Sequence, residues 1–307
     1  MNGILIVDKP TDWTSHDVVA KLRGALKTRR IGHGGTLDPM ATGVLPIFVG
    51  RATRAAEFCE NADKEYIAGL RLGVVTDTQD ITGTVLNQVV SEKTSEDVRA
   101  ILPHFTGPQN QIPPMYSAIK KDGKKLYELA RKGIEIERPA RFITIFELEL
   151  LDGINNTGST HNLTNLEPTD FTLRVVSSKG TYVRTLCHDI GAALGTGGTM
   201  SALRRTRAGS FTIKQAHSLD EILTAASNGE ISKLLLPTDS FFSDFPALTL
   251  TDSETSKVKN GASFPISKPC GRYRFYGPSG EFLALAEVVD RKSKLIKSFF
   301  EPMENSI

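Results

Sequence analysis

The stretch GHGGTLDPMATGVLP, residues 32–46, places one carboxylate, Asp38, between three glycines and Pro39. Glycine allows backbone angles closed to other residues and lets a strand or a ligand come close. A proline pushes the residue before it toward extended geometry. The apolar run 44–49 that follows is typical of a buried strand. The sequence therefore predicts an acid on a tight loop that leads into a core strand, a position where functional residues concentrate.

The local pattern leaves two other interpretations of Asp38 open. An aspartate after glycines often only closes a turn, because its side chain bonds its own backbone. A glycine-rich loop can also bind phosphate, but a P-loop needs Gly-Lys-Ser/Thr entering a helix, and a dinucleotide site needs a helix after the glycines. Here a strand follows them and Gly-Lys-Ser/Thr is absent. The pattern disfavours a nucleotide cofactor.

Composition limits the class of protein. The chain has 307 residues, of which 39% are hydrophobic, enough for one large domain or two unequal ones. No apolar run approaches membrane-spanning length, and the first residues do not resemble a signal peptide. Three widely spaced cysteines indicate a reducing cytoplasm and argue against a disulfide framework. Neither the cysteines nor the histidines have metal-ligand spacing, so we expect no metal.

The charge distribution is more informative than the net charge of +2. Basic residues form three clusters: Lys21, Arg23, Lys27, Arg29, Arg30, Arg51 and Arg54; Lys120, Lys121, Lys124, Lys125, Arg131 and Lys132; and Arg204, Arg205 and Arg207. A solvated basic face would explain them. Three such clusters on a nearly neutral chain also fit a one-sided footprint for a polyanion.

The spacing of apolar residues, and the turn-forming and capping residues between the apolar segments, predict a series of strands and helices. Strands are expected at 3–7, 44–49, 64–73, 143–151, 171–176 and 203–208, and helices at 15–26, 52–59, 94–105, 124–132 and 181–194. The polar segment 153–170 between two of these strands reads as a hairpin excursion. Composition changes near residue 240. Short alternating strands with turns then suggest a small β-barrel over about 246–303.

Several segments, together with the Asp38 loop, resemble the signatures of the TruB-type tRNA pseudouridine synthases. They are Ile6-Val7-Asp8-Lys9-Pro10, Lys64-Glu65-Tyr66 with Leu70-Arg71-Leu72-Gly73, Pro113-Pro114-Met115-Tyr116-Ser117-Ala118, Lys124-Lys125-Leu126-Tyr127-Glu128-Leu129-Ala130, Ser178-Lys179-Gly180-Thr181-Tyr182-Val183-Arg184-Thr185-Leu186 and Leu203-Arg204-Arg205. Their order and approximate spacing agree with the family from residue 3 to about 240. The polar excursion, and Thr196 where the family has a cysteine, depart from the pattern.

The resemblance implies a fold and an activity. The fold is an α/β (α+β) one, with a mixed, mostly antiparallel sheet flanked by helices. The implied catalytic domain is 1–240, with an RNA-gripping insert at about 106–140, followed by a PUA-like RNA-binding domain at 246–303. The implied activity is isomerisation of uridine to pseudouridine at position 55 in the TΨC loop of tRNA, without cofactor or metal. A cytoplasmic monomer is expected, with tRNA as partner and its acceptor end held by the C-terminal domain.

The resemblance also assigns roles to individual residues. Asp38 is the catalytic residue, Arg184 is its partner, and Tyr66 and Leu203 face the base, with Tyr182 as further support. The implied RNA contacts are His33, Lys64, Lys120, Lys124, Lys125, Arg131, Arg204 and Arg205. Taken singly, each has a plainer explanation as a core, surface or loop residue.

The chemistry fits one ionised carboxylate. Pseudouridine formation breaks the N1–C1′ bond, turns the uracil and joins C5 to C1′, so a carboxylate near C1′ and C2′ could act as nucleophile, base or charge stabiliser. An arginine partner favours the ionised form. Three rivals stay open at this stage: a guide-RNA-dependent synthase, a tRNA-folding chaperone with little catalytic role, and a small-molecule phosphate-binding protein.

Overall fold

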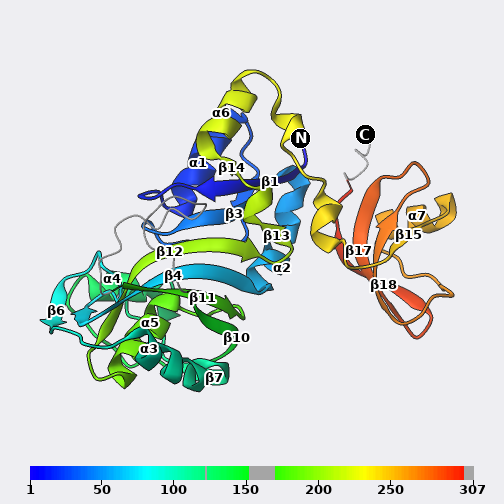
Figure 1. The fold of residues 1–307 in the computed structure, drawn as a ribbon. Coiled ribbons are helices and arrows are strands. Elements are labelled where there is room, and N and C mark those ends of the chain that lie inside the picture. The colour runs from blue at the N-terminus through cyan, green and yellow to red at the C-terminus, as the bar shows by residue number, and fades with distance from the viewer. Residues whose placement is uncertain (122, 152–169, 301–307) are drawn as a thin grey trace.

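The computed structural model describes residues 1–121, 123–151 and 170–300 of the chain. One large sheet dominates it (Figure 1). Its strands are β1 (Gly3–Lys9), β2 (Ile31–His33), β3 (Thr42–Val49), β4 (Lys64–Leu72), β7 (Gly107–Gln111), β10 (Arg141–Leu151), β11 (Asp170–Ser177), β12 (Gly198–Ala208), β13 (Phe211–Thr212) and β14 (His217–Ser218). They follow the order β14–β1–β3–β12–β4–β11–β10–β7, with β2 beside β3 and β13 beside β12.

The sheet is mixed and mostly antiparallel, as the sequence predicted. Only two of its neighbouring pairs among the described residues, β1 with β14 and β12 with β3, run parallel. The pair β12–β3 places Arg205 opposite Gly43. This long-range pairing brings the loop between β2 and β3, which carries Asp38, to the middle of the sheet.

Alternate residues of the central strands feed two cores, because successive side chains of a strand point to opposite faces. Leu5 and Ile47 belong to the larger core, and Ile6 and Phe48 to the second. Helices α1 (Ser15–Ala25), α3 (Ser95–Ile101), α5 (Val183–Ala193) and α6 (Leu219–Ser227) pack on the larger core. In Figure 1, α1 and α6 cover one end of the sheet, and α3 and α5 the other. The second core includes α2 (Ala56–Asn61) and the short 3-10 helices η1 (Gly50–Ala55) and η5 (Thr238–Phe242).

Some helix boundaries differ from the sequence prediction. Helix α1 is capped by Thr14, one residue before the predicted cap, since Thr14 and Asp17 form a reciprocal capping box. The predicted Thr94–Asp97 capping box is confirmed at α3. The basic helix predicted at 124–132 is only α4 (Leu126–Ala130). Lys124 and Lys125 instead form β9 (Lys124–Lys125), which pairs with β8 (Lys120–Lys121), so pairing between the two short strands outweighs local helix propensity there.

Strand β12 is longer than predicted and begins at Gly198 instead of residue 203. It pairs with β4 along its whole length, and this long-range contact supplies the hydrogen bonds that local sequence does not reveal. The remaining elements outside the C-terminal part are β5 (Val74–Thr76), β6 (Val85–Gln88), η2 (Leu102–Phe105), η3 (Ile213–Gln215) and η4 (Ile231–Lys233). The predicted excursion at 153–170 lies, apart from its last residue, outside the described residues.

The structure has a small four-stranded sheet where the sequence predicted a small β-barrel. It pairs β15 (Ala247–Thr249), β16 (Gly271–Tyr276), β17 (Phe282–Val289) and β18 (Lys292–Ser298) in that order, with α7 (Asp252–Lys259) beside it. Figure 1 shows it standing to one side of the large sheet. In the part of the chain that the structure describes, no helix is long and apolar enough to cross a membrane.

An aromatic cluster joins the small sheet to the large one. Phe242 is only 2% exposed, and its ring lies 5.4 Å from that of Phe58 on α2 and 6.1 Å from that of Phe282 on β17. The ring of Phe299 lies 5.7 Å away on another side. An ion pair between Lys297 and Glu57 also crosses this junction. The small sheet therefore packs against the second core of the large sheet through apolar contact.

A Phe242→Ala variant is expected to lose about 3–5 kcal/mol of unfolding free energy, because it empties a buried site shared by both sheets. Chemical denaturation followed by circular dichroism measures this loss. Phe142→Ala is the matched control: Phe142 is 73% exposed, and its removal should change stability by less than about 0.5 kcal/mol. Equal effects of the two variants would contradict the role given to the cluster.

Candidate active site

The loop that carries Asp38 is held on both sides by hydrogen bonds to its backbone. The amide of Leu37 donates to Ser15 Oγ at 2.9 Å, and the Pro39 carbonyl accepts from the amide of Asp12, also at 2.9 Å. Gly43 closes the loop with a φ of +100°, and a Cβ there would lie 2.2 Å from the Arg205 carbonyl oxygen. Only glycine fits this position, so the loop enters β3 in one conformation.

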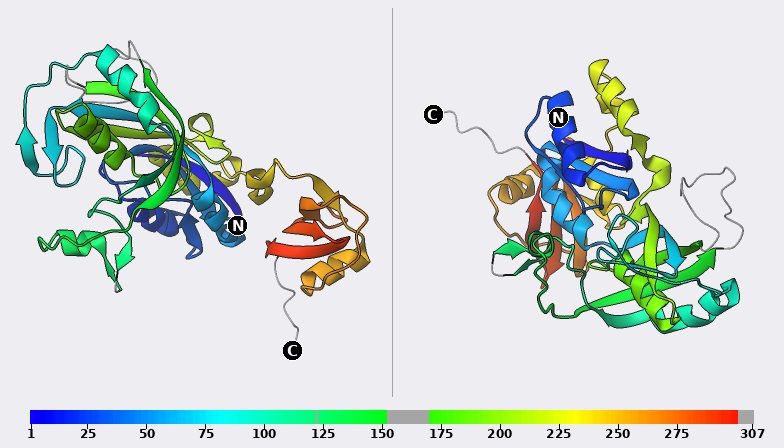
Figure 2. Two further views of the ribbon diagram at one scale, coloured as in Figure 1. Left: turned by 90° about the horizontal axis from the view of Figure 1, so that it is seen from below. Right: turned by 90° about the vertical axis from the view of Figure 1, so that its left-hand side faces the viewer.

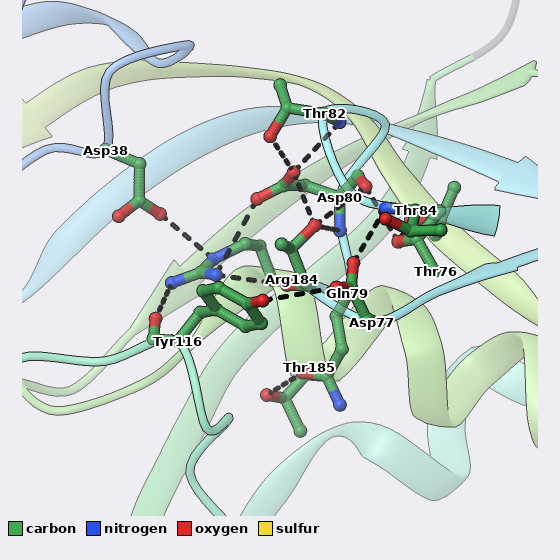
Figure 3. A network of polar contacts seen from close by, with 12 residues as sticks. Asp38, Thr76, Asp77, Gln79, Asp80, Thr82, Thr84, Tyr116, Arg184 and Thr185 are labelled. Carbon is green, nitrogen blue, oxygen red and sulfur yellow. Dashed lines mark hydrogen bonds and ion pairs between the residues drawn. The ribbon is translucent and has the colours of Figure 1, made fainter. Parts of the chain in front are cut away.

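Arg184 is the centre of the site (Figure 3). Its Nε lies 3.0 Å from Asp38 Oδ2, and the Arg184 side chain is only 6% exposed. Its two terminal nitrogens donate to the carbonyls of Thr78, at 3.0 Å, and Tyr116, at 2.9 Å. One guanidinium thus joins three separate segments: the Asp38 loop, the loop after β5 and the chain that follows β7.

The sequence analysis missed a second carboxylate, Asp80. Its Oδ2 lies 3.6 Å from Arg184 Nη1, and the residue is buried. Its Oδ1 accepts hydrogen bonds from Thr78 Oγ1, at 2.9 Å, and from the amide of Thr82, at 3.0 Å. The cluster of Asp, Thr and Gly at 77–84 signals a tight turn in the sequence. Nothing in that local pattern shows that the turn faces Arg184.

These charges act on Asp38 in opposite directions. Removal from water raises the pKa of Asp38 above its ordinary value, attraction from Arg184 lowers it, and repulsion from Asp80 raises it. Lys9 adds a smaller lowering effect on the pKa. The side chain of Asp38 keeps 38% of its surface exposed. Within the described residues only Oδ2 of Asp38 has a side-chain partner, so Oδ1 is open to a substrate.

An Asp80→Asn variant is expected to move the acid limb of the kcat profile to lower pH. The Asp80 carboxylate raises the pKa of Asp38, so its removal lets Asp38 stay ionised at lower pH. We also expect kcat at its plateau to fall about tenfold, since Arg184 loses a partner that orients it. Rates measured from pH 5 to 9 test both effects. An acid limb that moves upward would contradict this electrostatic account.

Among the described residues, Asp38 forms no hydrogen bond or ion pair with Tyr66 or Leu203, which were assigned to the base, or with Tyr182, assigned as further support. Tyr66 lies on β4, half-buried against the larger core, and Leu203 lies buried on β12. Tyr182 is the N-cap of α5, two residues before Arg184; its amide donates to Gln111 Oε1 at 2.8 Å, and burial raises the pKa of its hydroxyl. These placements leave the proposed contacts with the base as predictions.

The residues assigned to RNA fall into two groups. Lys120, Lys124 and Arg131 are exposed on the segment between β7 and β10, and Lys125 is half-buried there. The side chains of Lys125 and Arg131 lie over the ring of Tyr127, at 5.3 and 5.4 Å from its centre. By contrast, Lys64, Arg204 and Arg205 are buried, each engaged inside the protein.

His33 lies at the end of β2, half-buried, with its ring 5.2 Å from that of His16. Burial lowers the pKa of His33 to about 4, and His16 and Arg205 act in the same direction. His33 is therefore neutral near pH 7. It could meet RNA by stacking or hydrogen bonding, but not as a cation. Among the described residues, no three His, Cys, Asp or Glu side chains are grouped to hold a metal ion.

Comparison with solved structures identifies the class to which this fold and site belong. The chain superposes on one in the crystal structure of a Cbf5-Nop10-Gar1 complex with a TM-score of 0.72 and 26% identity, covering 98% of this chain and 85% of that one. A chain in the archaeal box H/ACA sRNP Nop10-Cbf5 complex gives 0.70 and 25%, with 98% and 87% covered. A sheet of this topology with an aspartate on the central loop is the pseudouridine synthase fold, as predicted.

Sequence comparison gives the family. Residues 23–183 match the model of the TruB family pseudouridylate synthase N-terminal domain, and 184–243 match the tRNA pseudouridylate synthase B C-terminal domain. The tRNA pseudouridine synthase B of Syntrophomonas wolfei is 45% identical, over 94% of this chain and 93% of that protein. The Bacillus subtilis protein of the same name is 44% identical, over 85% and 83%. The chain belongs to the TruB family of pseudouridine synthases, which are isomerases.

Proposed function

We propose that the protein isomerises uridine to pseudouridine at position 55 in the TΨC loop of tRNA, acting without a guide RNA. The observation that carries the proposal is the Asp38–Arg184 ion pair, set on the central loop of a TruB-family sheet. The relatives at 40–46% identity named tRNA pseudouridine synthase B support a tRNA substrate. They favour this function over a guide-dependent enzyme.

Asp38 acts on the sugar while the base turns. The N1–C1′ bond breaks and leaves its electron pair on N1, the uracil rotates, C5 bonds to C1′, the proton on C5 is released to solvent or to a nearby base, and N1 takes up a proton. Whether Asp38 serves as nucleophile, as base on C2′ or as charge stabiliser, it acts as a carboxylate with one free oxygen. Arg184 fixes Oδ2 and leaves Oδ1 for the substrate. Tyr66 stacks on the extracted base, Tyr182 supports Arg184, and Leu203 lines the base pocket.

The basic insert, here 106–140, offsets the energy needed to extract the base. Flipping a nucleotide out of a folded loop costs a few kcal/mol, and contacts with the phosphate backbone supply it. Figure 2 shows this segment projecting from the large sheet. It presents Lys120, Lys124, Lys125 and Arg131. His33 contacts the nucleotides at the mouth of the site.

We also propose a place for the rest of the substrate. The small sheet, as a PUA-like domain at 246–303 beside a catalytic domain at 1–240, holds the acceptor end of the tRNA. A surface hollow lined by Gly261, Lys292 and Lys294 supports this assignment, because lysines favour phosphate. The enzyme acts as a monomer in the cytoplasm, and the reaction itself calls for no cofactor.

Release of tritium tests the function. Purified protein is incubated with an unmodified tRNA transcript labelled with tritium at C5 of its uridines, with no other RNA. Since C5 loses its hydrogen when it bonds to C1′, release into water reports turnover, and mapping locates the modified residue. Release that maps to position 55 is expected. Binding without release would contradict the proposal and favour a guide-dependent enzyme or a chaperone.

A further inference from the structure

Arg205 is a fully buried arginine directly beneath the Asp38 loop. It lies on β12, opposite Gly43 on β3, and is only 1% exposed. Its Nε donates to the Val44 carbonyl at 2.7 Å. Its terminal nitrogens donate to the carbonyls of Thr36, at 3.3 Å, and Gly35, at 3.1 Å. One planar guanidinium therefore joins the limb of the loop that precedes Asp38 to the limb that follows it.

Two further buried cations share this pattern. Lys9 Nζ donates to the carbonyls of Pro10, Trp13 and Pro39, and Lys64 Nζ donates to those of Cys59, Glu60 and Ala62. Within 1–121, 123–151 and 170–300, none of the three forms an ion pair with a carboxylate. Burying a charge costs free energy. A buried cation whose hydrogen bonds all go to backbone carbonyls therefore points to a role in holding those backbone segments in place.

Arginine suits this place better than any other residue. Its fork offers five donors in one plane, whereas lysine is a single charge on a flexible stem. Three carbonyls from two limbs of one loop need donors at fixed separations, which the fork supplies. Gly43 lets the two strands come close enough, since a Cβ there would lie 2.2 Å from the Arg205 carbonyl oxygen.

We propose that Arg205 is a positioning residue for the reaction: it fixes the spacing between the two limbs of the Asp38 loop and so aims the carboxylate at the substrate. This rests on the proposed role of Asp38. It replaces the RNA contact that the sequence analysis assigned to Arg205, since a buried guanidinium with its donors in use does not reach a phosphate.

The proposal separates catalysis from binding. We expect Arg205→Met to lower kcat about 100-fold, the effect of a misplacement of about 1 Å at a reacting group. The Kd for tRNA and its dependence on salt should stay unchanged, because no phosphate contact is lost. Hydrogen exchange adds a readout independent of activity: amides in peptides covering 32–46 should exchange faster in the variant. Arg205→Lys, which keeps the charge but not the fork, should show a smaller fall in kcat.

Arg174→Met is the matched control. Arg174 lies on β11 and pairs with Glu65 and Glu147, away from the Asp38 loop. The Arg174→Met variant should lose unfolding free energy, with no change in kcat or in the hydrogen exchange of residues 32–46. Should Arg205→Met fail to fold, Arg205→Lys decides by the same measurements.

The outcomes distinguish the two proposals. Full kcat in the Arg205 variants, with Asp38→Ala inactive, would overturn the positioning role and leave the function standing. Weaker tRNA binding with a shallower salt dependence and unchanged kcat would assign Arg205 to RNA instead. Turnover by Asp38→Ala at the parent rate would remove the catalytic role of Asp38, on which the positioning role rests, and would leave the isomerisation standing. Absence of release by the parent enzyme would remove the function itself.

Discussion

Asp38→Ala is expected to bind tRNA as tightly as the parent enzyme and to lose at least about 10⁴-fold in turnover. The carboxylate is the only acidic group in the site with exposed surface and an oxygen free of protein partners among the described residues. Its loss removes the group that acts on the sugar, whereas the basic insert and the rest of the loop stay intact. Single-turnover tritium release and filter binding measure the two quantities separately.

Asp38→Asn is the sharper control, because it keeps the size of the side chain and removes only its charge. We expect it to be as inactive as the alanine variant. Tritium release at the parent rate by either variant, with circular dichroism showing a native fold, would make Asp38 a turn residue. If either variant still promotes tRNA folding, the protein has a chaperone role in addition to its catalytic one.

Arg184→Met is expected to lower kcat about 100- to 1000-fold, the usual cost of removing one electrostatic partner from an active site. Two effects combine. Asp38 loses the group that orients Oδ2, and Asp80 is left without the cation between the two carboxylates. Arg184 lowers the pKa of Asp38, so without it that pKa rises. The ionised form is then lost at a higher pH, and the acid limb of the kcat profile moves upward.

Arg274→Met serves as the control for lost charge. Arg274 lies on β16 of the small sheet, and its Nη1 is 3.7 Å from Asp239 Oδ2 on η5. Its replacement should leave the acid limb of the kcat profile unchanged. A shift in the Arg184 variant alone would support its effect on Asp38. Unchanged kcat and an unchanged acid limb in Arg184→Met would show that the ion pair is structural and would contradict its catalytic assignment.

Much of the fold could be predicted because its signals are local. Apolar runs mark β1, β3 and β4, and the Thr94–Asp97 pair marks the start of α3. The boundaries that were wrong depend on partners far along the chain. Strand β12 is lengthened by pairing with β4, and Lys124 and Lys125 leave the predicted helix for a short hairpin.

The site could be predicted only in part. The resemblance pointed to Asp38 and to Arg184 as its partner, and the structure brings the two side chains together. Asp80 was missed because its turn carries no local sign of what it faces. The basic motif Leu203-Arg204-Arg205 pointed to RNA, since charge is visible in a sequence whereas burial is not.

The sequence by itself determined the class of sheet, the tight loop around Asp38 and the family. Glycines, a proline and an apolar run restrict the backbone whatever lies nearby. The tertiary structure alone decided which basic side chains are exposed and which are buried beneath the loop. Pairing of β12 with β3 and β4 places Arg205 under the loop, out of reach of water. Burial is a property of the packed chain. An arginine on the surface can meet a phosphate, whereas an arginine in the interior can only bind groups of the protein itself.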